Sequence, residues 1–143
     1  MELFTSRWAN RDLAHLDVTP VGISRGVPRW RLPYRYKKLP MLAPSREAFR
    51  IEDPKEFERV YRTELEEIGA ERITQALRVI SQEHGGKPLV CLCWERSGEF
   101  CHRRVWADWW LEQTGQRVPE LEANAVVEQH KPAQKTLFDM EGE

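Results

Sequence analysis

The sequence predicts an α/β fold: a single three-layer domain with a small, mostly parallel β-sheet flanked by helices, followed by a flexible C-terminal tail. Two apolar runs, 18–24 and 88–93, are bounded by turn residues, which is typical of buried strands. Residues 57–68 and 73–80, between these runs, repeat apolar side chains at helical spacing. Strands that alternate with helices indicate βαβ units and a parallel sheet. We place the domain at residues 1–123 and the tail at 124–143.

The remaining elements follow in chain order. Residues 2–6 form a short apolar run that we interpret as the first strand. Residues 25–46 contain four prolines, which exclude a long helix, so we expect a long ordered loop there. A third helix is expected from about 101 to 113. Residues 117–121 are interpreted as an edge strand, because they contain a proline.

Composition bounds the class of protein. The chain has 143 residues, of which 41% are hydrophobic and 31% charged, as expected for one globular domain. It shows no apolar run of transmembrane length and no secretory leader, so we expect a cytoplasmic protein and no membrane partner. The three cysteines, Cys91, Cys93 and Cys101, are clustered, which favours a reducing compartment over a disulfide framework.

The net charge of −1 hides an uneven distribution. Residues 1–50 carry ten Lys and Arg against four Asp and Glu, a balance of +6. Residues 51–143 carry twelve against nineteen, a balance of −7. The basic N-terminal third favours an anionic partner.

The segment from Cys93 to Arg104 carries most of the chemistry. Cys93 would end the central strand, so Trp94 and Glu95 would face the crevice where parallel sheets bind ligands. Cys101 and His102 would open the next helix, whose free N–H groups and dipole favour phosphate. Arg103 and Arg104 add forked donors nearby. The helix field would also lower the pKa of a cysteine placed there.

Three interpretations of the cysteines stay open. Cys101 or Cys93 is a nucleophile or redox thiol, or the cysteines and His102 bind a metal. The third interpretation is that Cys91 and Cys93 are small buried residues and Cys101 orders the loop. The spacing C-x-C-x7-C-H matches no usual zinc pattern, so we assign no metal and no cofactor. The Cys-x5-Arg loop of phosphatases is also missing from the sequence.

Several motifs resemble those of the domain-of-unknown-function family 488 and follow one another along the chain as they do in that family. They are LVCLCWERSGEFCHRRVWA, LFTS near the N-terminus, VGISRG with Pro28, and YKKLPMLAP. The resemblance covers about residues 2–121 and implies a small α/β domain found in bacteria and their phages, without supplying a reaction. By position, the family's site residues would be Ser24, Arg25, Cys93, Glu95, Cys101, His102 and Arg103.

These positions converge if the two buried strands are parallel neighbours. Ser24–Arg25 and Cys93–Glu95 would then open on the same crevice as the Cys-His pair. Arg25 and Arg103 would bind an anion, and Glu95 or His102 would act as general acid or base. The alternative for Glu95 is a structural ion pair with an arginine.

The segment 24–38 contains six basic residues and no acid. Aromatic residues are interleaved with these cations, as in proteins that bind single-stranded nucleic acid or nucleotides. The alternative is a solvated loop whose aromatics pack on the core and whose arginines pair with the acidic helices. The candidate nucleic-acid-binding residues are Arg29, Trp30, Arg31, Arg35, Lys37 and Lys38, beside Arg25.

The tail contains Gln134-Lys135-Thr136-Leu137-Phe138, which resembles the bacterial sliding-clamp-binding peptide at Gln134, Leu137 and Phe138. Lys135 departs from the usual leucine. A polar tail suits such a peptide, because two apolar anchors suffice to enter a groove. The alternative is that the anchors fold back onto the domain.

Three functions are consistent with these features. The first is an enzyme acting on nucleic acid or nucleotides, a hydrolase or transferase at a phosphate or glycosidic bond. The second is a non-catalytic adaptor that binds nucleic acid or protein and is recruited by a sliding clamp. The third is a phage protein that inhibits a host enzyme.

Overall fold

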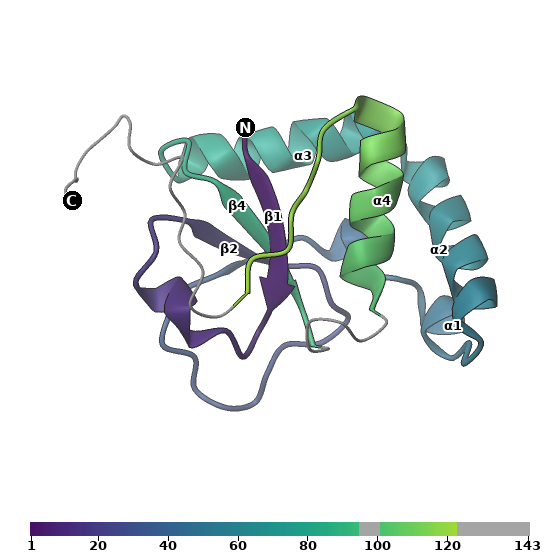
Figure 1. Cartoon of the computed structure of the whole chain (residues 1–143), viewed down its shortest axis with the longest axis horizontal. Helices are drawn as coiled ribbons and strands as arrows, with labels where there is room; N and C mark the ends of the chain where they lie inside the picture. Colours follow the sequence, from purple (N-terminus) through teal and green to yellow (C-terminus); the bar gives the residue numbers. More distant parts are fainter. Residues whose placement is uncertain (95–100, 123–143) are drawn as a thin grey trace.

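A computed structural model describes residues 1–94 and 101–122. Glu95 and the tail motif of Gln134, Leu137 and Phe138 lie outside the described residues. A four-stranded sheet forms the centre of the fold (Figure 1). Its strands are β1 (Leu3–Arg7), β2 (Thr19–Gly22), β3 (Lys37–Lys38) and β4 (Leu89–Cys93). The order is β1-β4-β2-β3, and every pair is parallel.

Three longer helices follow the sequence periodicity. They are α2 (Pro54–Ile68), α3 (Ala70–Glu83) and α4 (His102–Thr114). A short helix, α1 (Arg46–Phe49), precedes them, and two 3-10 helices, η1 (Arg11–Ala14) and η2 (Pro40–Leu42), lie in the N-terminal part. Gly69 separates α2 from α3. Its φ of 92° is a backbone geometry that residues other than glycine rarely adopt, so a glycine suits this junction.

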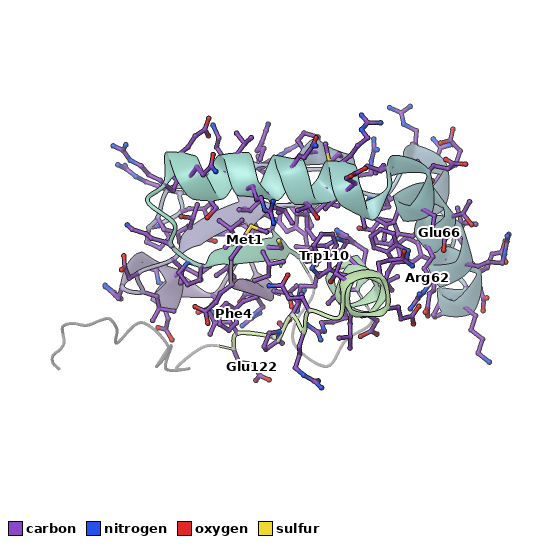
Figure 2. The ribbon with its side chains drawn as sticks, turned by 90° about the horizontal axis from the view of Figure 1, so that it is seen from above. Met1, Phe4, Arg62, Glu66, Trp110 and Glu122 are labelled. Atoms are coloured by element: carbon purple, nitrogen blue, oxygen red, sulfur yellow. The ribbon has the colours of Figure 1, made fainter. Side chains whose placement is uncertain are left out.

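The two faces of the sheet are covered differently. Leu3, Val21, Leu89 and Cys91 pack with α2, α3 and α4 in the larger apolar cluster. The opposite face, which includes Phe4, is covered by residues of η1 and of the segment 27–36, and Figure 2 shows Phe4 on the side away from α3. The predicted α/β fold with a small parallel sheet is confirmed. The second covering layer consists of a 3-10 helix and a loop rather than of α-helices.

Two segments differ in detail from the prediction. The predicted loop 25–46 contains the short strand β3, the helix η2 and the first residue of α1. The predicted edge strand 117–121 is a single parallel bridge between Thr5 and Glu120. The proline before Glu120 lacks the N–H that a longer ladder would need. Within residues 1–94 and 101–122, the helices are too short or too polar to cross a bilayer.

Candidate active site at the carboxyl ends of β2 and β4

The carboxyl ends of β2 and β4 lie at the same edge of the sheet. The two strands are parallel neighbours, with Val21 opposite Cys91 and Gly22 opposite Leu92. Ser24 and Arg25 follow β2 at this edge, where α/β sheets usually bind ligands. A pocket of about 420 Å³ lies here, lined by Trp8, Gly22, Ser24, Arg25, Gly26, Val27, Lys38, Pro40, Ala43, Pro44 and Ser45.

His102 connects the start of α4 to the end of β2. Its Nε2 donates a hydrogen bond to the carbonyl oxygen of Ile23 at 2.9 Å. The ring also stands edge-to-face against Tyr61, with 5.6 Å between centroids. Because a carbonyl only accepts, Nε2 carries a proton, and in the neutral ring the lone pair lies on Nδ1. The Cys-His pair is thereby held next to the Ser24–Arg25 turn.

Cys101 and His102 line a second, smaller pocket of about 170 Å³. Pro44 lines both pockets, so the two hollows adjoin rather than form one chamber. The smaller pocket is mostly apolar and contains one carboxylate, that of Glu52. Its lining residues are Pro44, Phe49, Ile51, Glu52, Phe57, Cys101 and His102.

The strand cysteines are buried and hard to ionise. Burial raises the pKa of Cys91 to about 12. Burial and the hydrogen bond with Cys101 raise the pKa of Cys93 well above its ordinary value, although Arg103 acts in the opposite direction. A protonated thiol is a poor nucleophile. Cys101 is itself only 3% exposed, but it lines the smaller pocket and is therefore better placed to react than Cys93.

The two arginines of α4 are engaged within the chain. Arg103 is 1% exposed, donates to both carboxylate oxygens of Glu120, and donates from an Nη to Cys93 Sγ at 3.0 Å. Burial acts to lower the pKa of Arg103, but Glu120, Cys93 and Cys101 together raise it above its ordinary value. Arg104 donates to Thr5 Oγ1 at 2.8 Å and to the Val118 carbonyl oxygen at 2.7 Å. These bonds position α4, and we assign neither arginine to the anion pocket.

The turn after β2 is fixed by a residue that the sequence does not single out, Trp8. Its Nε1 donates to Ser24 Oγ at 2.9 Å, and Ser24 Oγ donates to the carbonyl oxygen of Gly26 at 2.5 Å. A Cβ on Gly22 would lie 2.6 Å from the Trp8 ring, so only glycine allows this packing. Arg25 makes one long hydrogen bond, 3.4 Å, to the carbonyl oxygen of Pro44.

The basic segment 24–38 divides into a packed part and an exposed part. The Tyr34 hydroxyl donates to the Trp8 carbonyl oxygen at 2.6 Å, and Tyr36 packs edge-on against Trp8. Burial raises the pKa of Tyr34. In contrast, Trp30 is exposed and contacts Trp94. The six basic side chains are all exposed, and in the described part of the chain only Lys37 forms an ion pair, with Glu83 at 3.8 Å.

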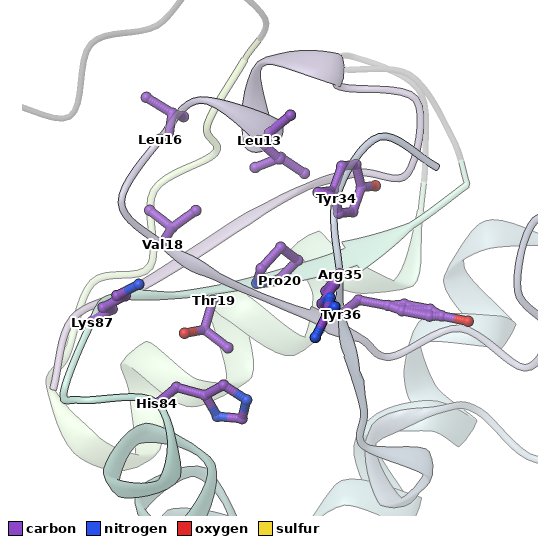
Figure 3. Close-up of a pocket in the computed structure, with 11 residues that line it drawn as sticks. Leu13, Leu16, Val18, Thr19, Pro20, Tyr34, Arg35, Tyr36, His84 and Lys87 are labelled. Carbon is purple, nitrogen blue, oxygen red and sulfur yellow. The ribbon is translucent and has the colours of Figure 1, made fainter. Parts of the chain in front are cut away.

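A larger pocket, about 600 Å³, lies away from this site (Figure 3). Its lining includes Thr19, where β2 begins, and Lys87, which precedes β4 and pairs with Asp17 at 3.2 Å. Of the predicted site residues within 1–94 and 101–122, only Arg35 lines it. Among the residues that the structure covers, no three or more His, Cys, Asp or Glu side chains are grouped to hold a metal ion.

Comparison with known proteins identifies the family. The family model described as the active DUF488-N3 subclade matches residues 5–115, a span that includes both strand ends and the Cys-His pair. No curated protein and no solved structure matches the chain. Because the matched span covers most of the sequence, the chain belongs to the domain-of-unknown-function family 488.

Proposed function

We propose that this protein is an enzyme acting on nucleic acid or nucleotides, a hydrolase or transferase at a phosphate or glycosidic bond. The observation that supports it most is the hydrogen bond from His102 Nε2 to the Ile23 carbonyl oxygen. This bond holds a nucleophile-and-base pair, Cys101 and His102, beside the pocket of Ser24 and Arg25. A reactive pair next to a cationic pocket is the minimum that such chemistry requires.

The residues divide into two roles. Arg25 and Lys38 are both exposed and both line the pocket of about 420 Å³, where they would bind the phosphate. Cys101 would act as nucleophile or His102 as general acid or base in the adjoining pocket. Glu95 keeps its proposed acid-base role, although it lies outside the described residues. The matched family model is described as an active subclade, and for this reason we test the chain for catalysis.

The test begins with a search for turnover. Full-length protein is incubated with nucleoside mono- and diphosphates, dinucleotides and single-stranded oligonucleotides, and products are identified by mass spectrometry. For the substrate found, Cys101→Ala and His102→Ala should abolish turnover while the circular-dichroism spectrum stays native. Arg25→Ala should raise KM, and Arg72→Ala, an exposed arginine on α3, should change nothing. Unchanged turnover in both the Cys101 and His102 variants would overturn the proposal.

A non-catalytic adaptor recruited by a sliding clamp is the second candidate. It is supported by Gln134, Leu137 and Phe138 in the tail. Calorimetry of a 130–143 peptide and of the full-length chain against a bacterial sliding clamp tests it, with Leu137→Ala and Phe138→Ala as variants. Absence of binding at high micromolar concentration by both would remove the clamp from the proposal. The three cysteines form no disulfide, which is consistent with the reducing cytoplasm that we propose as the protein's location.

A further inference from the structure

Two exposed tryptophans touch each other at the edge of the candidate site. Trp30, from the basic segment, and Trp94, which directly follows β4, are 49% and 38% exposed. Their rings meet edge-to-face with 5.7 Å between centroids and 77° between planes. Tryptophan is usually largely buried, so two half-exposed indoles in contact form an unusual apolar feature. An edge-to-face pair also leaves ring faces open to a third flat group.

The surroundings of the pair are cationic. Arg29 and Arg31 flank Trp30 in sequence, and both are exposed. Arg25 and Lys38 line the pocket next to the same strand ends. All four side chains are exposed, and within residues 1–94 and 101–122 none of them forms an ion pair.

We infer that the Trp30–Trp94 pair is a base-stacking platform that binds single-stranded nucleic acid next to the candidate active site. This inference rests on the proposed function and narrows its substrate class. A mononucleotide carries a single base and a compact phosphate group, whereas the cations here extend from Arg25 to Lys38. A strand presents phosphates in succession together with unstacked bases. A duplex hides its base faces inside its own stack, so indole rings on a surface cannot reach them.

The arrangement assigns a path to the strand. A base lies on the indole pair, the phosphates beside it contact Arg29 and Arg31, and the strand continues toward Arg25. The next nucleotide then lies at the pocket of about 420 Å³, where Arg25 and Lys38 bind its phosphate. Stacking is tolerant of base identity, because every base has an aromatic face. The platform is therefore expected to bind DNA and RNA strands with little sequence preference.

The test measures fluorescence anisotropy of labelled oligo-dT and oligo-U of about twenty nucleotides, longer than one single-strand binding site. It uses the full-length Cys101→Ala protein, so that the probe is not consumed. Trp30→Ala and Trp94→Ala should each weaken binding about tenfold. The double variant should lose less than the product of the two single losses, since the rings act as one unit. Trp30→Phe should recover most of the affinity, and Leu111→Ala, an exposed apolar residue on α4, should leave it unchanged.

Two competitors separate stacking from simple charge attraction. Inorganic polyphosphate of similar charge and a duplex of the same length should both compete poorly. Equal competition by either, or unchanged strand binding in both tryptophan variants, would overturn the inference. The stacking inference fails, and the proposed chemistry stands, if the wild-type enzyme turns over a mononucleotide while the single strand does not bind. The proposed chemistry fails, and the stacking inference stands, if single strands bind in a tryptophan-dependent way while Cys101 and His102 prove dispensable for turnover.

Discussion

His102 and Ile23 are 79 positions apart in the sequence, yet their side-chain Nε2 and backbone carbonyl oxygen lie 2.9 Å apart. This contact joins the N-terminus of α4 to the carboxyl end of β2. It also sets the ring tautomer, because the proton that the carbonyl accepts must be carried by Nε2. The relationship makes His102 a structural residue as well as a candidate catalytic one, and the two roles are separable by experiment.

Replacing His102 should therefore affect stability in a way that depends on the new side chain. His102→Ala leaves the Ile23 carbonyl without this donor and removes the packing against Tyr61. We expect a loss of about 2–4 kcal/mol in the free energy of unfolding. His102→Gln keeps an N–H donor and should lose less than half as much. Urea unfolding followed by circular dichroism measures both, and equal losses would contradict this role for the ring.

A methyl group at position 22 should disturb the site by displacing the Trp8 ring. In Gly22→Ala the new Cβ would overlap the Trp8 ring, with 2.6 and 2.7 Å to its two nearest atoms. Displacing that ring costs about 1–3 kcal/mol and breaks the bond from Trp8 Nε1 to Ser24 Oγ. Thermal unfolding and near-ultraviolet circular dichroism should both change. Gly26→Ala is the matched control, because a Cβ added there would meet no atom within 4 Å; a similar loss in that variant would rule out this explanation.

The buried Arg103–Glu120 pair should matter far more than an exposed pair of similar geometry. Glu120→Gln removes the negative charge that faces a guanidinium only 1% exposed. We expect a loss of about 3 kcal/mol, since breaking a buried pair leaves one charge uncompensated. Glu112→Gln, which removes the partner of Arg62 at 2.9 Å, should cost less than about 1 kcal/mol because Glu112 is 61% exposed. Chemical denaturation of both variants makes the comparison, and equal effects would contradict it.

Stability should fall at alkaline pH through the buried thiols. The pKa of Cys91 in the folded protein is about 12, above the 9.0 of an unperturbed thiol. The unfolded chain therefore releases this proton first, so the stabilisation is complete below about pH 9 and is lost as pH rises toward 12. Cys93 acts in the same direction.

Cys91→Ala isolates this contribution. Its dependence of unfolding free energy on pH should be shallower than that of the wild type, by up to about 1.4 kcal/mol per pH unit between about pH 9 and 12. The comparison uses the slope, because the truncation also changes packing at every pH. Urea unfolding at about pH 8.5 and about pH 10.5 gives the slopes, and identical slopes would show that Cys91 ionises equally in both states.

The sequence by itself determined the elements that depend on local patterns. The apolar run 88–93 became β4, and the helical repeat before Gly69 became α2, because hydrophobic periodicity reports which face of an element is buried. The sequence left open whether β2 and β4 are neighbours. The structure pairs them in parallel, and this puts their carboxyl ends at one edge of the sheet.

Only the tertiary structure decided which side chains those elements bring together. Arg103 looked like an anion ligand from its place at a helix start, but Glu120, on a segment beside β1, engages it. Tyr34 and Trp30 belong to the same basic segment, yet one packs on the core and the other is exposed. Periodicity carries no information about such contacts. They depend on how distant segments fill space against each other, which is a property of the packed chain and not of any local stretch of it.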